Sequence, residues 1–209
     1  LTLCAGDALT WDSPVRAART SLDLSGLTAA ETAELAEAVR ADAAAPEPYP
    51  ADTYFGGKAL YRDAQLYALA AQLGLDAEAA AVRERVTTEL LRWADPAGCE
   101  TRDAFCFFYD TANRGVVGQT PSFGSDEFND HHFHYGYFLY AAGVVAADDP
   151  DLAGRLAPVV DLLAADIASA PASDRFPRWR TFDVYASHAW ASGTSPFADG
   201  NNQESSSEA

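Results

Sequence analysis

Two apolar stripes with a helical period, separated by a short break, constrain the fold of this chain more than any other feature. The first stripe lies between residues 57 and 73 and consists of Leu60, Ala64, Tyr67, Ala68 and Ala71. The second runs from Asp76 to Trp93, where Val82, Val86, Leu90 and Trp93 recur at spacings of four, four and three. Gly74 suits the end of one helix, and Pro96 follows the other. The pattern predicts a helical hairpin.

Three further segments carry helix signals. Thr28 and Glu31 form a capping-box pair before an apolar run to Arg40. Three prolines in residues 44–50 then require an extended connector, so the next helix should begin near Phe55. Helices are also expected over 129–147 and 150–168, whereas the residues through Leu27 show no clear period. The chain therefore belongs to the mainly α class, as an all-α domain of helical hairpins.

The remaining segments do not have a helical period. An aromatic run, a polar turn and two valines over residues 101–117 predict a short β-hairpin near 104–118. Residues 169–202 are rich in Pro, Gly, Ser and aromatics and are expected to form a long functional loop. Residues 203–209 are expected to begin another helix. Because such a helix could not cover its apolar face, we expect residues 1–209 to be one portion of a larger domain.

Composition excludes several classes of partner. The chain has 31 Asp and Glu against 14 Lys and Arg, a net charge of −17, which argues against nucleic acid. The most apolar stretch, residues 137–147, is too short to span a bilayer, so no membrane association is expected. The absence of Met and of a secretory leader indicates a processed or cut piece. Cys99 and Cys106 could form a disulfide or pack as small buried apolar side chains.

Acids, histidines and aromatics gather in the segment FGSDEFNDHHFHYGY at residues 123–137. In a helix that opens at residue 129 or 130, Asp130, His134 and Tyr137 share one face, and His131 lies on the adjacent one. When phenylalanine side chains pack around a carboxyl that lies beside an imidazole and a phenol, desolvation can raise the pKa of that carboxyl. The segment therefore suits acid catalysis.

Two other clusters carry chemistry. Glu204 and Glu208 are four residues apart and would share one helix face. The alternative is that both are acids favoured at the start of a helix by its dipole, without a catalytic role. Between residues 178 and 190, aromatic side chains accompany Asp183, His188 and Trp190. Such side chains suit a sugar-binding cleft, because pyranose rings present C–H faces to aromatics and hydroxyls to charged groups. Ordinary aromatic packing is the alternative.

A metal site built from Asp130 and the neighbouring histidines is less well supported. Zinc motifs on helices place two histidines at i and i+4, whereas His131, His132 and His134 are spaced by one and two. We therefore expect neither a metal nor another cofactor, and a metal-dependent hydrolase is a minor alternative.

The motifs, taken together, closely resemble glycoside hydrolase family 81, the endo-β-1,3-glucanases. The resemblance rests on residues 123–137, on SHAWASG at 187–193 and on FADGNNQESSSEA at 197–209. Shorter matches lie at 54–58, 109–110, 115–118 and 180–183. The likeness thus runs from about residue 50 to the end, and the family commonly has Gly-His-Ser-Trp where this chain has Ser187, His188, Ala189 and Trp190.

The resemblance implies inverting hydrolysis of β-1,3-glucan on an (α/α)6 barrel of helical hairpins. By the matching motifs, Asp130 is the general acid, Glu204 the general base and Glu208 an auxiliary carboxylate. Substrate binding is expected from His131, His134, Tyr137, Asp183, His188 and Trp190.

The family also implies partners and a location. The remainder of the parent chain should supply further barrel helices and an N-terminal β-sandwich. A polysaccharide substrate that cannot enter a cell implies a secreted protein. A non-catalytic β-glucan-binding fragment is the main alternative function.

Overall fold

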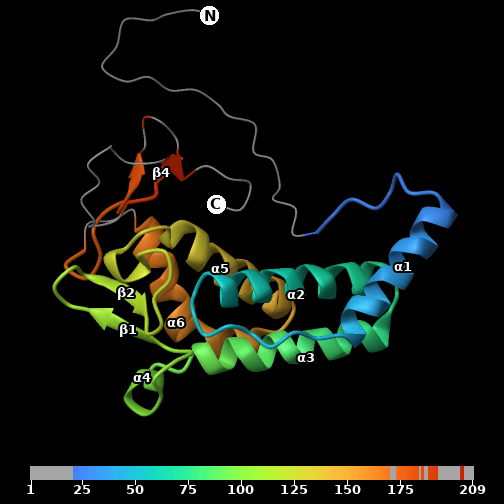
Figure 1. The fold of residues 1–209 in the computed structure, drawn as a ribbon, viewed down its shortest axis with the longest axis horizontal. Coiled ribbons are helices and arrows are strands. Elements are labelled where there is room, and N and C mark those ends of the chain that lie inside the picture. Colours follow the sequence, from blue (N-terminus) through green and yellow to red (C-terminus); the bar gives the residue numbers. More distant parts are fainter. Residues whose placement is uncertain (1–20, 170–172, 184, 186–187, 193–202, 205–209) are drawn as a thin grey trace, which may run out of the picture.

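The computed structural model describes residues 21–169, 173–183, 185, 188–192 and 203–204 (Figure 1). Five long helices dominate this part of the chain: α1 (Ala29–Ala44), α2 (Phe55–Gln72), α3 (Asp76–Trp93), α5 (His131–Ala146) and α6 (Pro150–Ala168). All five were predicted, although α1 runs past Arg40 to Ala44. The mainly α class is therefore confirmed.

The helices pack as hairpins around α5. Helices α2 and α3 form the predicted hairpin and turn at Gly74, whose φ of 68° a glycine tolerates without strain. Helix α5 lies against both α2 and α6 and contributes Tyr135, Phe138 and Ala141 to the core. Trp93 of α3 is 1% exposed and meets Phe138 at a ring separation of 5.1 Å. Helix α5 is thus the central element of the described fold (Figure 1).

Local signals account for the starts of two helices. The Thr28 side chain accepts a hydrogen bond from the Glu31 N–H at 3.3 Å, and the Thr28 N–H donates to Glu31 at 2.8 Å, which completes the predicted capping box. At α6, the Asp149 carboxylate accepts from the Leu152 N–H at 3.0 Å, and Pro150 occupies the first turn. Both helices begin where the sequence chemistry favours it.

The predicted β-hairpin is present. Strands β1 (Phe107–Asp110) and β2 (Gly115–Gly118) pair antiparallel, with Phe107 opposite Gly118. Two very short helices were not predicted: α4 (Gly98–Thr101) precedes the hairpin, and the 3-10 helix η1 (Ser125–Glu127) precedes α5. Both are too short to show a periodic pattern in the sequence.

A second small sheet corrects two expectations. Strands β3 (Phe182–Asp183), β4 (His188–Trp190) and β5 (Gln203–Glu204) pair antiparallel in the order β3-β4-β5. The expected loop over 169–202 therefore contains strands, and the helix expected from residue 203 begins as a strand instead. Strands of two or three residues have no readable period, and their partners are distant in the sequence. Residues 205–209 of the expected helix lie outside the described residues.

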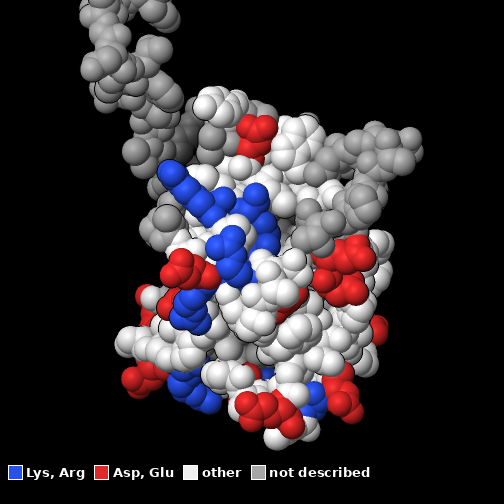
Figure 2. Space-filling view, turned by 90° about the vertical axis from the view of Figure 1, so that its left-hand side faces the viewer, with Lys and Arg blue, Asp and Glu red and all other residues white. Residues whose placement is uncertain are grey.

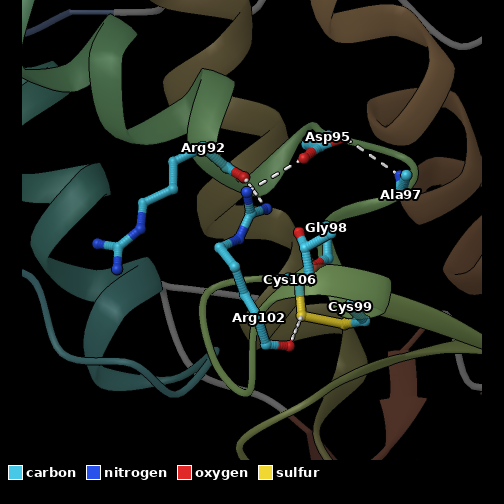
Figure 3. Close-up of a disulfide and its surroundings, with 8 residues drawn as sticks. Arg92, Asp95, Ala97, Gly98, Cys99, Arg102 and Cys106 are labelled. Atoms are coloured by element: carbon cyan, nitrogen blue, oxygen red, sulfur yellow. Dashed lines mark hydrogen bonds and ion pairs between the residues drawn. A yellow bond between two sulfur atoms is a disulfide. The ribbon is translucent and has the colours of Figure 1, made fainter.

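Cys99 and Cys106 form a disulfide, which resolves the alternative that the sequence left open (Figure 3). The bridge joins α4 to the residue before β1, and Cys106 is fully buried. Beside it, the Arg102 guanidinium donates to the Arg92 carbonyl at 2.8 Å and to Asp95 at 3.1 Å.

In the portion of the chain described, no helix has both the length and the apolar character needed to cross a membrane.

Candidate active site

Asp130 lies at the start of α5 in a pocket of about 190 Å³. The pocket is lined by Tyr54, Phe123, Asp130 and Phe133. Asp130 has a φ of 55°, in the left-handed region that few non-glycine residues adopt. Its N–H donates to the Ala191 carbonyl at 2.8 Å. Backbone strain of this kind persists where the surrounding structure enforces it, often at functional sites.

The same hydrogen bond brings the two predicted catalytic segments together. Ala191 directly follows β4, and Ala189 within β4 pairs with Glu204 of β5. The backbones of Asp130 and Glu204, which are far apart in the sequence, therefore both meet one short stretch of chain at residues 189–191. The side chain of Glu204 and all of Glu208 lie outside the described residues.

A buried charged network lies next to the acid. The His131 Nδ1 is 2.6 Å from the Asp166 carboxylate, and Nε2 is 2.8 Å from the Ser125 carbonyl oxygen. Both ring nitrogens thus lie within hydrogen-bond distance of an oxygen atom. Asp166 also accepts from the Val116 N–H at 3.0 Å and from the Arg180 guanidinium at 2.8 Å. This network connects the residue next to Asp130 with helix α6.

His134 packs against Tyr54, which lines the pocket, and is fully buried. Burial, with a smaller contribution from the charge of His131, lowers the pKa of His134 to about 3. Its Nδ1 is 2.8 Å from the Thr53 hydroxyl, and its ring lies 5.4 Å from that of Tyr54. A neutral imidazole therefore lies next to Tyr54 at ordinary pH.

The predicted substrate-binding residues of α5 are not on the surface. His131, His134 and Tyr137 are each at most 1% exposed, so the described structure gives them no face open to a substrate. His134 and Tyr137 pack against Tyr54, which lines the pocket. Direct contact of the three residues with substrate stays a prediction.

The second group of predicted binding residues lies on the small sheet. Asp183 and Trp190 line a hollow of about 420 Å³ together with Arg180, Thr181, Phe182 and Tyr185. The His188 ring packs edge-on against Trp190 at 4.6 Å. The Asp183 carboxylate accepts from the Tyr185 N–H at 2.8 Å. The structure therefore brings all three predicted residues to one place, where aromatic and charged groups alternate.

Sequence reasoning missed several residues of the site. Tyr54 and Phe123 line the pocket, and both lie in the motifs that carry the family resemblance, which was a usable signal. Asp166 was also missed, although an acid between Leu163 and Ile167 on the buried face of α6 is unusual. A fully buried acid indicates a partner, which the structure identifies as His131 and Arg180.

Charge is unevenly distributed over the molecule. Figure 2 shows the end that carries the strands, where Lys and Arg side chains gather in the middle and acidic side chains lie around them. One of the basic side chains of the molecule, Arg180, lines the hollow on the small sheet. Among the residues with described positions, no group of three or more His, Cys, Asp or Glu is arranged to hold a metal ion.

The described residues define an α-helical hairpin domain with a carboxyl group set in an aromatic pocket. The chain belongs to the family described as the glycosyl hydrolase family 81 C-terminal domain, whose model matches residues 25–209. This confirms the family that the motifs suggested.

Curated relatives and a solved structure support the assignment. The chain is 45% identical over 176 residues to a glucan endo-1,3-beta-D-glucosidase of Acetivibrio thermocellus, covering 82% of this chain and 22% of that protein. A relative of the same name from Thermobifida fusca is 43% identical over 164 residues, covering 76% and 21%. A glycoside hydrolase family 81 structure from Clostridium thermocellum matches with a TM-score of 0.76 and 38% identity, covering 90% of this chain and 26% of that one. This structural likeness is consistent with a segment of an α-toroid.

Proposed function

We propose that this chain carries the catalytic centre of an inverting endo-β-1,3-glucanase. Asp130 acts as the general acid that protonates the leaving oxygen, and Glu204 acts as the general base that activates water. Glu208 assists as an auxiliary carboxylate. The observation that carries the proposal is the convergence of Asp130 and Glu204 on residues 189–191.

The physical requirements of inversion support these roles. An inverting glycosidase needs two carboxyls about 6.5–9.5 Å apart, so that a water fits between the base and the sugar. Asp130 at a helix start and Glu204 on a strand belong to separate elements, which permits such a gap. The aromatic lining of the Asp130 pocket suits a pyranose ring, and the relatives are named as glucan endo-1,3-beta-D-glucosidases.

We also propose where the rest of the site comes from. The chain spans about a fifth of the length of the curated relatives it matches. The complete activity is therefore assigned to the full-length protein, in which further barrel helices and a β-sandwich accompany this portion. Asp183, His188 and Trp190 contribute contacts to the glucan, and His131, His134 and Tyr137 shape the wall beneath the acid.

Export from the cell fits both the substrate and the disulfide. A β-1,3-glucan polymer is too large to enter a cell, and disulfides such as that of Cys99 and Cys106 persist in oxidising compartments. We therefore propose that the protein is secreted. Recovery of the intact protein from the cytosol alone would contradict this.

The test uses Asp130→Asn and Glu204→Gln in the full-length protein with laminarin as substrate. Each substitution removes one proton-transfer group, so kcat should fall by roughly 10²–10⁴ while glucan binding persists. Asp126→Asn is the matched control, because Asp126 is an exposed acid of η1 outside the pocket, and its kcat should stay near wild type.

Product stereochemistry provides an independent measurement. NMR of the wild-type reaction should show the α-anomer first, because inversion of a β-linkage yields an α-hydroxyl. First release of the β-anomer would contradict the assignment of Asp130 as acid and Glu204 as base in an inverting reaction. Near-wild-type turnover by Asp130→Asn would contradict the assignment of Asp130 as the general acid. If the protein binds laminarin but releases no reducing ends, it is a glucan-binding protein without catalytic activity. If chelation of metal ions abolishes the activity, the protein is a metal-dependent hydrolase.

A further inference from the structure

Asp166 is a buried carboxylate that has no part in the proposed proton transfers. Its side chain is fully buried on α6, between the core residues Leu163 and Ile167. Burying a charge is costly unless the charge is paired. The Asp166 carboxylate lies 2.6 Å from the His131 Nδ1 and accepts a hydrogen bond from the Arg180 guanidinium at 2.8 Å. These two partners belong to different parts of the candidate site.

The first partner holds the start of α5, where the proposed acid lies. His131 directly follows Asp130, and its Nε2 lies 2.8 Å from the Ser125 carbonyl oxygen. The His131 ring is 1% exposed, so contacts at both ring nitrogens fix its position. Asp130 has a φ of 55°, a conformation that persists only where the surroundings enforce it. The pairing of His131 with Asp166 contributes to that support.

The second partner holds the strands that carry the proposed base. Besides its bond to the Asp166 carboxylate, the Arg180 guanidinium donates through Nε to the Asp166 backbone carbonyl at 3.0 Å. The carbonyl of the next residue, Thr181, accepts from the Trp190 N–H of β4 at 3.0 Å. Strand β4 in turn pairs with β5 at Glu204. Arg180 therefore connects Asp166 with the small sheet that includes Glu204.

The contacts on the two sides close into one circuit. The Asp130 N–H donates to the Ala191 carbonyl at 2.8 Å, and Ala191 directly follows Trp190. From Asp130 the circuit runs through His131, Asp166, Arg180, Thr181, Trp190 and Ala191, and it returns to Asp130. Asp166 makes the two links of this circuit that join side chain to side chain, whereas the other links are peptide bonds and backbone hydrogen bonds. A change at Asp166 therefore acts on both sides of the site.

We propose that Asp166 is a positioning residue of the hydrolysis, which fixes the backbone that carries the acid relative to the strands that carry the base. This inference rests on the proposed function and adds to it a residue that does not touch the substrate. Inversion requires the two carboxyls to lie about 6.5–9.5 Å apart, with a water between the base and the sugar. A misplacement of about 1 Å can lower a rate about 100-fold. Asp166 therefore controls the rate of the chemical step and has little effect on substrate affinity.

The test measures Asp166→Asn in the full-length protein with laminarin as substrate. Asn has nearly the shape of Asp, but its amide has only one oxygen, so the His131 and Arg180 contacts no longer both meet a carboxylate oxygen. Scaled to the folded fraction measured by circular dichroism, kcat should fall roughly 10- to 100-fold with little change in KM. The Kd for laminarihexaose, measured in an Asp130→Asn background to prevent turnover, should also change little.

Asp63→Asn is the matched control, because Asp63 is also a buried acid with an arginine partner. Asp63 is 4% exposed on α2 and accepts from Arg85 at 2.8 Å and from the Tyr49 hydroxyl at 2.7 Å. It lines neither the Asp130 pocket nor the hollow on the small sheet. Its replacement should lower stability but leave kcat per folded molecule near the wild-type value.

The comparison separates positioning from stability alone. Equal values of kcat per folded molecule in Asp166→Asn and Asp63→Asn would overturn the positioning role of Asp166. An increase in KM and Kd without a fall in kcat would also overturn it, because the effect would then lie in binding. Either result leaves the proposed function standing if Asp130→Asn is inactive. Near-wild-type turnover by Asp130→Asn would instead overturn the proposed acid, and the positioning role with it.

Two substitutions of His131 test the same contact if Asp166→Asn does not fold. The amide nitrogen of Asn lies near the position of the His Nδ1, and that of Gln lies near the position of Nε2. His131→Asn therefore keeps an N–H group on the side of Asp166, whereas His131→Gln keeps one on the side of the Ser125 carbonyl. We expect His131→Asn to have the higher kcat per folded molecule. Equal or reversed kcat values would overturn the positioning role of Asp166.

Discussion

His134 links pocket chemistry to the stability of the fold. Its side chain is fully buried against Thr53 and beneath Tyr54, and its pKa is lowered to about 3 by burial and by the charge of His131. An exposed histidine in the unfolded chain titrates near 6.5. Folding therefore favours the neutral ring.

This shift predicts a specific loss of stability in acid. Between pH 6.5 and 3 the unfolded chain binds a proton at His134 that the folded chain does not, so this contribution to stability is present above pH 6.5 and declines as pH falls. The decline approaches about 1.4 kcal/mol per pH unit within the window and amounts to roughly 2 kcal/mol at pH 5. Urea denaturation of wild type and His134→Gln at pH 7.5 and pH 5 should show a smaller pH-dependent loss for the variant. Equal pH-dependent losses of stability in the two proteins would contradict the lowered pKa of His134.

At the scale of elements, the Cys99–Cys106 disulfide constrains the connection from α3 to β1. The two cysteines are separated by 7 positions, and Arg102 between them is bonded to the end of α3 through the Arg92 carbonyl (Figure 3). The Phe105 ring packs against Trp93 and lies under the Arg92 guanidinium. The bridge thus anchors the start of the β-hairpin to the helical core.

Removing the bridge should cost about 2 kcal/mol of unfolding free energy, the chain-entropy value for a loop of this length. The double variant Cys99→Ala with Cys106→Ala should show this loss in urea denaturation at pH 7.5. Dithiothreitol should destabilise wild type by a similar amount and leave the double variant unchanged. A wild type insensitive to reduction would show that the bridge does not stabilise the fold.

At the scale of the whole molecule, one carboxylate connects elements that lie far apart in the described chain. Asp166 of α6 bonds His131 of α5, Val116 of β2 and Arg180 just before β3. Its side chain is fully buried, and Arg180 is 7% exposed. Gly115 leaves the space for this network, because a Cβ there would overlap Phe128 and Arg180. One buried group therefore links α5, α6, the β-hairpin and the residue two positions before the second sheet.

Asp166→Asn should reduce the free energy of unfolding by about 3–5 kcal/mol, because removing one partner of a buried ion pair leaves the other uncompensated. Asp161→Asn on the same helix is exposed and should change it by at most about 0.5 kcal/mol. Chemical denaturation followed by circular dichroism measures both variants. Similar small changes in the two proteins would show that the network carries little of the stability.

The sequence by itself determined the helices and their hairpin. Periodic apolar positions such as Val82, Val86 and Leu90 act between near neighbours in the chain, and so do the Thr28 capping box and the Gly74 turn. The motif around Asp130 was also readable, because it is contiguous. These features depend on local chemistry, which a sequence displays directly.

Only the tertiary structure decided how the site is assembled. Strands β3, β4 and β5 are too short to carry a pattern, and their pairing depends on contacts between distant segments. The burial of His131 against Asp166 also followed from packing, since a helical face shows which residues are neighbours but not what covers them. The meeting of Asp130 with Ala191, and of Glu204 with Ala189, has the same origin. Non-local contacts of this kind form only when the whole chain is packed, and here they turn separate motifs into one candidate site.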